Sequence, residues 1–183
     1  MQGKTHIAAA AALSLGIITY KWGNQDLLES GILIAATVSG SLLPDIDIKQ
    51  SKVSHKHKFI SFFIRLFIEH RGTHSIIFMG ILTIPLFIIV TFLPEMIKPY
   101  GYIYGIGILI GYASHILLDM LTPKGSPILN PICKYSVSIL PIQTGGFIEF
   151  IFRMGLYVFS IYLFWENLKP IVDSIVNKIT YYL

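Results

Sequence analysis

Five apolar stretches, each close to the length of a bilayer crossing, constrain the fold of this chain more than any other feature. A transmembrane helix needs roughly 20 predominantly apolar residues, with a range of about 17–25. The stretches are Ile7–Trp22, Leu27–Pro44, Thr73–Pro94, Tyr102–Leu121 and Phe147–Trp165. The sequence therefore predicts an all-α, polytopic membrane protein with about five transmembrane helices.

The composition agrees with a membrane protein. Of 183 residues, 54% are hydrophobic and 13% are charged, and the mean hydropathy is +0.67. A soluble domain carries about 25% charged residues. The single cysteine, Cys133, excludes an intrachain disulfide, and the net charge of +4 needs no nucleic-acid partner to explain it.

Two further segments are predicted to lie in the membrane interface. In Lys58–Glu69 the aromatic and polar residues separate onto two helix faces, but twelve residues at about 1.5 Å each are too few to cross a bilayer. Residues 167–183 begin with Lys169-Pro170 and then place apolar residues four apart, which predicts a separate amphipathic helix. We expect a single membrane-embedded domain over residues 1–183, with a core of 1–166 and this interfacial tail.

The predicted crossings place the candidate functional residues on one face of the membrane. The N-terminus and segments 45–72 and 122–146 share that face, whereas segments 23–26 and 95–101 and the C-terminal tail lie on the other. The residues on or near the first face are His6, Asp45, Asp47, His70, His74, His115, Asp119, Glu149 and Arg153. Imidazole and carboxylate groups are costly near hydrocarbon, and in such places they usually mark a function.

The distribution of Lys and Arg predicts the orientation. The first face carries ten of the 14 cations and the second carries four, namely Lys21, Lys98, Lys169 and Lys178. The positive-inside rule therefore makes the first face cytoplasmic. If some of these Lys and Arg residues bind an anionic substrate instead, the rule would predict the wrong orientation.

His115 and Asp119 are four residues apart near the end of an apolar helix, so both can reach one ion. A neutral His hydrogen-bonded to Asp in a helix bundle is the equally weighted alternative. His70 and His74 have the same separation, with Gly72 between them and Thr73 as the expected helix cap. Water-exposed interfacial histidines are the alternative there.

Asp45 and Asp47 follow Pro44 and suit the ligation of one or two cations, although a solvated loop would look the same. His6 alone is a weak candidate. Glu149 and Arg153, four apart, could form an ion pair, or could act as an extra ligand and a phosphate clamp. Lys124, in a turn, is a second candidate anion contact. Each of these candidate residues is weak evidence by itself, but their combination on one predicted face favours a metal site.

Four motifs taken together resemble a known family. They are Gly3-Lys4-Thr5-His6, Leu43-Pro44-Asp45-Ile46-Asp47, His70-Arg71-Gly72-Thr73-His74-Ser75 and His115-Ile-Leu-Leu-Asp119-Met-Leu-Thr-Pro123. Over roughly residues 1–155 they resemble bacterial inner-membrane proteins of the YdjM type, described as metal-dependent hydrolases. That family is in turn similar to zinc-dependent phospholipase C and to single-strand nucleases of the S1/P1 kind. The resemblance implies six metal ligands: His6, Asp45, His70, His74, His115 and Asp119.

The expected function is hydrolysis, at one membrane face, of a phosphoester of a lipid or lipid-linked substrate. One to three divalent ions, Zn²⁺ by preference and otherwise Mn²⁺ or Mg²⁺, would activate water. Asp47, Arg71, Glu149 and Arg153 are the residues predicted to assist catalysis. Lipid amides or esters are further substrates, and a metal or proton transporter and a non-catalytic scaffold are the competing functions. The sequence leaves the oligomeric state open.

Overall fold

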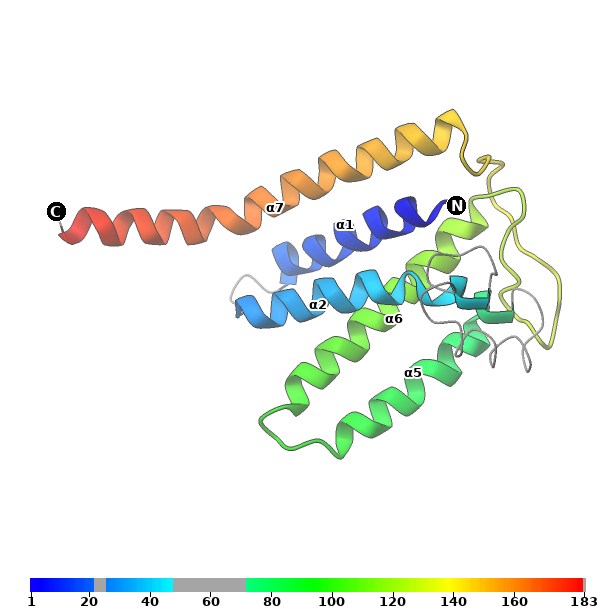
Figure 1. The fold of residues 1–183 in the computed structure, drawn as a ribbon, viewed down its shortest axis with the longest axis horizontal. Helices are drawn as coiled ribbons and strands as arrows, with labels where there is room; N and C mark the ends of the chain where they lie inside the picture. The colour runs from blue at the N-terminus through cyan, green and yellow to red at the C-terminus, as the bar shows by residue number, and fades with distance from the viewer. Residues whose placement is uncertain (22–25, 48–71, 183) are drawn as a thin grey trace.

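The computed structural model describes residues 1–21, 26–47 and 72–182, and every regular element within those ranges is a helix. The elements are α1 (Gly3–Lys21), α2 (Leu27–Gly40), the short 3-10 helices η1 (Leu43–Asp47) and η2 (Gly72–His74), α5 (Ile76–Thr91), α6 (Lys98–Met120) and α7 (Phe147–Tyr182). Figure 1 shows the long helices side by side, with α7 and α1 above α2, and α6 and α5 below. The predicted all-α fold is confirmed.

Each of the five predicted spans overlaps one long helix. Among the described residues, three segments are long and apolar enough to cross a membrane: Leu27–Asp45, Lys98–Met120 and Phe147–Pro170. Helix α5 is a shorter apolar helix because the chain leaves the helix at Phe92, ahead of Pro94. Helix α1 has 19 residues but is not among the segments apolar enough to count as a candidate span.

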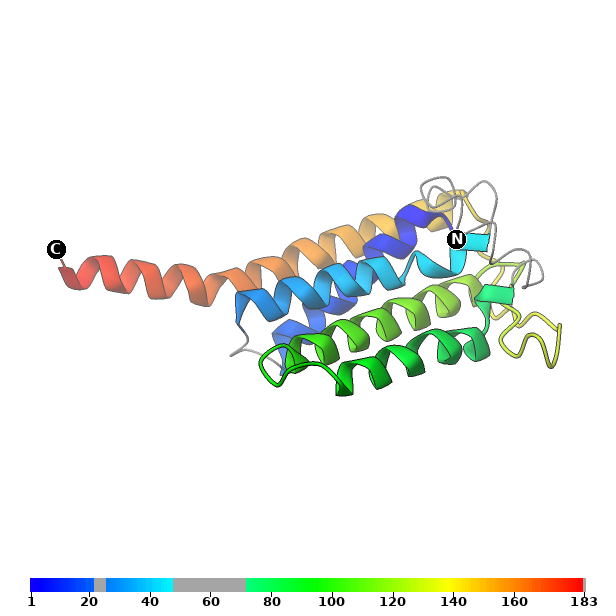
Figure 2. The ribbon, with the colours of Figure 1, turned by 60° about the horizontal axis from the view of Figure 1, so that its bottom comes forward.

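The last helix is longer than the sequence predicted. We expected a separate interfacial helix after Lys169-Pro170, but α7 continues through Pro170 to Tyr182. Its final part extends away from the other helices, as Figures 1 and 2 both show. Proline removes one backbone donor and bends a helix without always ending it. The predicted interfacial helix Lys58–Glu69 lies outside the described residues.

Small residues set the packing of α2 against α6. A Cβ atom on Gly111 would lie 2.0 Å from the carbonyl oxygen of Thr37, and one on Gly40 would lie 2.4 Å from that of Ile108. Only glycine fits at these two positions, and small residues are what allow helices in a membrane to approach closely. This contact brings the C-terminal ends of α2 and α6 together.

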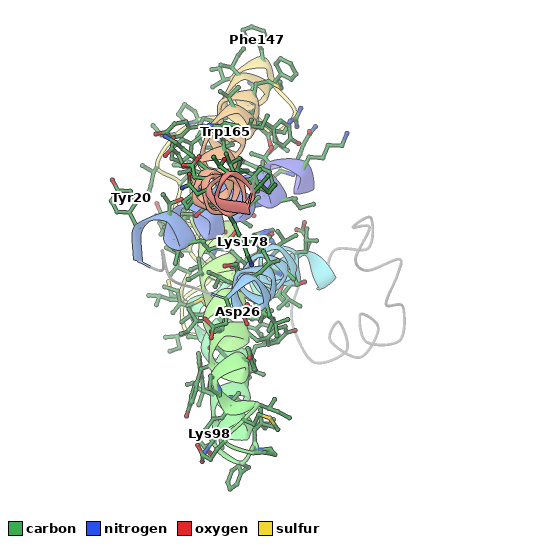
Figure 3. All side chains as sticks on the ribbon, turned by 90° about the vertical axis from the view of Figure 1, so that its left-hand side faces the viewer. Tyr20, Asp26, Lys98, Phe147, Trp165 and Lys178 are labelled. Carbon is green, nitrogen blue, oxygen red and sulfur yellow. The ribbon has the colours of Figure 1, made fainter. Side chains whose placement is uncertain are left out.

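The polar segments collect at one end of the bundle. The N-terminus, η1, η2, the C-terminal end of α6 and the beginning of α7 lie together on the right of Figure 1. Figure 3 looks from the opposite end, where Tyr20, Asp26 and Lys98 are labelled. The polar segments therefore lie at one end of the bundle, as the predicted number of membrane crossings required.

Candidate metal site

Five of the six predicted ligands converge at this end. His6 comes from the first turn of α1, Asp45 from η1, His74 from η2, and His115 and Asp119 from the last turns of α6. Two groups of ligand atoms, His6/His115/Asp119 and Asp45/His74/His115, each lie within 4.8 Å of one another. Because both groups contain His115, they form one cluster, which we call the His/Asp cluster.

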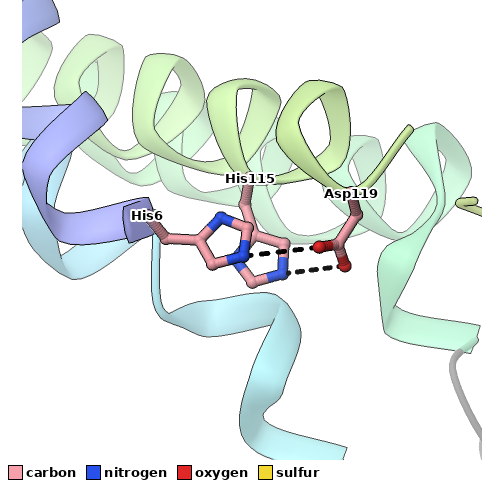
Figure 4. A group of neighbouring side chains, drawn as sticks. All are labelled: His6, His115 and Asp119. Carbon is pink, nitrogen blue, oxygen red and sulfur yellow. Dashed lines mark ion pairs between the residues drawn. The ribbon is translucent and has the colours of Figure 1, made fainter. Parts of the chain in front are cut away.

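Asp119 lies at the centre of the His/Asp cluster. Its Oδ1 is 3.4 Å from Nε2 of His6, and its Oδ2 is 3.5 Å from Nε2 of both His74 and His115. Figure 4 shows Asp119 facing the rings of His6 and His115. The amino group of Met1 also contacts Oδ1. The two oxygens of this carboxylate thus face different histidines.

Asp45 approaches the His/Asp cluster from the other side. Its Oδ1 is 3.7 Å from Nε2 of His74 and 3.7 Å from Nε2 of His115. The α-helix ends at Gly40, and Pro44 disfavours an α-helical residue before it, so the chain turns into η1 here. The side chain of Asp45 is 20% exposed, which makes it the most accessible of the five candidate ligands.

The histidines of the His/Asp cluster are buried with unused ring nitrogens. Both ring nitrogens of His6 and Nε2 of His115 are buried without a hydrogen-bond partner. The two rings stack, with centroids 3.7 Å apart and planes inclined by 10°. A neutral imidazole keeps one lone pair, and the burial of His6 without a hydrogen-bond partner leaves that lone pair available to a metal.

Hydrogen bonds on the far side of two rings fix which nitrogen faces the cluster. Nδ1 of His115 lies 2.6 Å from the carbonyl oxygen of Ser41. A carbonyl can only accept, so Nδ1 carries the proton and Nε2 carries the lone pair. Metal-binding histidines in proteins are commonly oriented in this way, by a carbonyl or carboxylate behind the ring.

His74 is oriented by the same principle through a hydroxyl group. Thr73 Oγ1 donates to the carbonyl oxygen of Pro44 at 2.7 Å and lies 3.3 Å from Nδ1 of His74. Because the hydroxyl has already donated its one proton, it accepts from Nδ1. Nε2 of His74 then presents its lone pair to the carboxylates of Asp45 and Asp119.

Several contacts hold η2 in place. Tyr112 donates its hydroxyl to the carbonyl oxygen of Thr73, and Ser126 Oγ donates to that of His74 at 2.8 Å. The sequence predicted Thr73 as the cap of the following helix, but Ser75 takes that role and accepts from Phe78 N at 3.1 Å. The hydroxyl of Thr73 faces Pro44 and the His74 ring instead.

Sequence reasoning missed three residues that support the ligands: Ser41, Thr73 and Tyr112. Ser41 acts through its backbone carbonyl, which no residue type could reveal. Tyr112 could have been noticed, because its hydroxyl lies on an apolar helix one turn before His115. The structure shows that this tyrosine is fully buried. These contacts connect α2, η2 and α6, so they depend on the tertiary packing.

Glu149 ties the beginning of α7 to the beginning of α1. The side chain is 1% exposed. Its Oε1 accepts from Gln2 N at 2.6 Å and from Thr5 Oγ1 at 2.7 Å, and its Oε2 accepts from Gly145 N at 2.6 Å. Arg153 Nη1 donates to the side-chain oxygen of Gln2 at 2.7 Å. Both residues therefore lie next to the turn that carries His6, outside the two ligand groups.

The remaining predicted residues are placed as follows. Asp47 ends η1, and only its backbone is described. His70 and Arg71 lie outside the described residues. Lys124 is exposed in the segment that follows α6.

The fold and the His/Asp cluster define a class: an all-helical membrane protein with a buried candidate metal site at one end. The chain belongs to the YdjM inner membrane protein family, whose model matches residues 1–183. It is 34% identical over 166 residues to the uncharacterized protein YvsG of Bacillus subtilis (strain 168), covering 90% of this chain and 95% of that protein. It is 34% identical over 137 residues to the inner membrane protein YdjM of Escherichia coli (strain K12), covering 72% of this chain and 66% of that protein.

A protein of the same name from Shigella flexneri matches with the same values. No solved structure matches the chain. The relatives and the apolar helices make this chain an inner-membrane, multi-pass protein, as predicted.

Proposed function

We propose that the His/Asp cluster binds divalent metal and that the protein is a membrane-bound hydrolase acting on phosphoesters of lipids or lipid-linked molecules. The distances between facing donor atoms carry the proposal. They measure 3.4, 3.5 and 3.7 Å. Ligand atoms bound to Zn²⁺ at about 2.0–2.1 Å in a tetrahedron lie roughly 3.3–3.4 Å from one another. The five side chains are thus spaced like a ligand set, and the unpaired ring nitrogens gain a partner when an ion binds.

The donor types favour particular ions. Three imidazoles and two carboxylates suit Zn²⁺ best, and Mn²⁺ or Mg²⁺ would depend more on the carboxylates. The residues that would hold an ion form two groups, His6, His115 and Asp119 on one side and Asp45, His74 and His115 on the other. His115 has a single lone pair, on Nε2, so it could serve only one of the two groups at a time. His70 is a further proposed ligand.

The chemistry follows from the position of the site at the end of the bundle. A bound divalent ion supplies Lewis acidity and lowers the pKa of water toward neutrality. His74 and His115 are held from behind, so the cluster needs little rearrangement to bind. Asp45 lies on the accessible side, where a substrate can approach. Arg71, Arg153 and Lys124 are the proposed contacts for a phosphoryl group, and Asp47 is the proposed assisting carboxylate. For Glu149 we propose a supporting role, because its hydrogen bonds hold the turn that carries His6.

The location of the site supports a lipid substrate and argues against transport. Transporters bind their ions near the middle of the bilayer. Here all five candidate ligands lie in the terminal turns of helices or in the 3-10 segments beside them, an end of the bundle that we infer to lie near the lipid headgroups. The sequence segments predicted to share this face carry most of the Lys and Arg residues, which supports a cytoplasmic orientation.

The decisive measurement is metal content by mass spectrometry on purified protein in detergent. Wild type is compared with His74→Ala, Asp119→Ala and the control Asp26→Ala, which removes an exposed carboxylate at the opposite end. All must first elute as folded protein on gel filtration. We expect one or two equivalents of Zn²⁺ or Mn²⁺ in wild type and in the control, and none in the other two variants.

Hydrolysis is then assayed with vesicles containing different phospholipids. We expect product from wild type and the control only, and its loss when a chelator is added. Wild type without metal, even after Zn²⁺ or Mn²⁺ is supplied, would refute the metal site. Metal without hydrolysis of any lipid class would refute the hydrolase, and metal uptake into proteoliposomes would replace it with a transporter.

A further inference from the structure

An apolar groove runs between α1, α6 and α7. Its volume is about 550 Å³, and its walls are almost entirely apolar. Small residues of α1 form its floor, namely Ala9, Ala12 and Gly16. Larger side chains of the other two helices form its sides, among them Leu117 and Phe159.

The groove exists because of the spacing of these small residues. Ala9, Ala12 and Gly16 are three and four residues apart, so they lie on one face of α1. At Gly16 the nearest atom to an added Cβ is Leu163 Cδ1, at 3.8 Å. The face of α1 that a bulky side chain would fill is thus left open.

One end of the groove adjoins the His/Asp cluster. Ala9 lies one turn beyond His6 on α1, and Leu118, which also lines the groove, immediately precedes Asp119 on α6. From Ala9 to Tyr20 the groove follows α1 for about 16 Å, taking a rise of about 1.5 Å per residue. Half of a hydrocarbon core is about 15 Å, so the groove is about as deep as one leaflet.

The groove is open towards the bilayer. Three residues that line it are substantially exposed: Leu13 at 45%, Leu117 at 59% and Phe159 at 51%. In a multi-pass membrane protein, exposed apolar side chains at this depth face lipid. The material that fills such a groove in the membrane is hydrocarbon chain.

We infer that the groove holds an acyl chain of a lipid whose polar headgroup lies at the His/Asp cluster. This inference rests on the proposed function and names its substrate class: a phosphoester that carries at least one long acyl chain, rather than a water-soluble phosphoester. Lipid tails are as apolar as the groove, so the walls add little hydrophobic driving force. The groove acts through shape, because seating the chain fixes the depth of the headgroup relative to Asp119 and His6.

The test fills the groove and measures retained lipid and metal together. Gly16→Leu places a side chain on the floor, and Leu117→Trp enlarges an exposed wall residue. The matched control is Gly31→Leu on α2, where nothing lies within 4 Å of an added Cβ. Each protein is extracted from vesicles of dioleoyl phosphatidylglycerol and phosphatidylethanolamine, washed in detergent and weighed by native mass spectrometry.

We expect wild type and Gly31→Leu to keep one phospholipid per chain, and Gly16→Leu and Leu117→Trp to lose it while keeping their metal. Equal retention by all four proteins, or no retained lipid in wild type, overturns the inference. If Gly16→Leu fails to elute as folded protein, Leu117→Trp decides alone. Groove-dependent lipid in a wild type without metal would refute the proposed function and leave the groove assignment standing.

Discussion

The polar residues at the two ends of the helical bundle are stabilised in opposite ways. At the end with the His/Asp cluster, His6, His74 and His115 are at most 1% exposed and face partners from distant parts of the chain. At the other end, Glu95 and Lys98 pair within a single turn, and the side chain of Glu95 is 89% exposed. Water stabilises the polar groups at one end, whereas the fold itself stabilises those at the other.

The difference matters because burying polar groups is costly. A buried polar group without a partner costs roughly 1–3 kcal/mol by mutational data. The apolar core around Ile18, Leu33 and Ile103 shows the ordinary solution, in which only apolar side chains are buried. A buried cluster of histidines and carboxylates in the same bundle is what a binding site requires and what simple packing would avoid.

The sharpest test of the two-ended arrangement is chemical labelling from each side of the membrane. Cys133 is the only cysteine and is exposed at the His/Asp end. We expect a membrane-impermeant maleimide to label it in inside-out vesicles and not in spheroplasts. The double variant Cys133→Ser, Glu95→Cys should show the reverse pattern, because residue 95 lies at the other end. Labelling of both cysteines from the same side would contradict the arrangement.

The next largest effect is expected from Gly111→Ala, which disrupts the close packing of α2 against α6 next to the site. The new Cβ would lie 2.0 Å from the carbonyl oxygen of Thr37, so α2 and α6 must separate. Overpacking of this kind costs about 1–3 kcal/mol. We expect a lower melting temperature in detergent and a loss of bound metal, since the ring of His115 would leave the carbonyl of Ser41.

The control for this change is Gly155→Ala on α7, where nothing lies within 4 Å of an added Cβ. It should melt at or slightly above the wild-type temperature, because alanine favours a helix over glycine by up to about 1 kcal/mol. Equal melting temperatures for the two variants would show that α2 and α6 do not depend on close contact.

A smaller effect should follow from Thr73→Val, which keeps the shape and removes the hydroxyl behind His74. We expect metal affinity to fall by roughly 10–100-fold, the range found when outer partners of metal ligands are removed. A chelating dye that competes for Zn²⁺ measures this directly. Thr91→Val is the matched control, because its hydroxyl bonds only within its own helix, to Ile88 O at 2.7 Å. Equal affinities in the two variants would remove Thr73 from the site.

The smallest effect belongs to the opposite end. Lys98→Ala breaks the exposed pair with Glu95, and such surface pairs contribute about 0–1 kcal/mol. We expect the melting temperature to stay close to that of wild type and the metal content to be unchanged. A loss of metal would mean that the two ends of the bundle are coupled.

Much of the fold could be predicted because hydrophobic length is a local signal. Each predicted span overlaps one of the long helices, and the number of crossings correctly put His6, Asp45, His74, His115 and Asp119 at one end. The error at the C-terminus has a physical cause: Lys169-Pro170 resembles a helix boundary, yet α7 continues through the proline. Local residue preferences do not distinguish a proline that bends a helix from a proline that ends it.

The candidate site was predictable as a set of residue types and less so as a geometry. The spacing of His115 and Asp119 places them on one helix face, and the structure keeps them there. Glu149 looked equally like a ligand, but three donors from the beginnings of α1 and α7 occupy its oxygens. Its partners Gln2 and Thr5 lie 147 and 144 residues away along the chain.

The sequence by itself determined that this protein lies in a membrane, where its helices are, and which helix ends carry histidine and aspartate. These features could be read from the sequence because hydrophobicity and helical period act over short stretches of chain. The tertiary structure alone decided which nitrogen of each ring faces the His/Asp cluster, that both oxygens of Asp119 are shared among three histidines, and that an open groove leads away from them. Those features depend on how closely α2 approaches α6 and how α1 lies against α7, and such distances are set by packing between residues far apart in the chain.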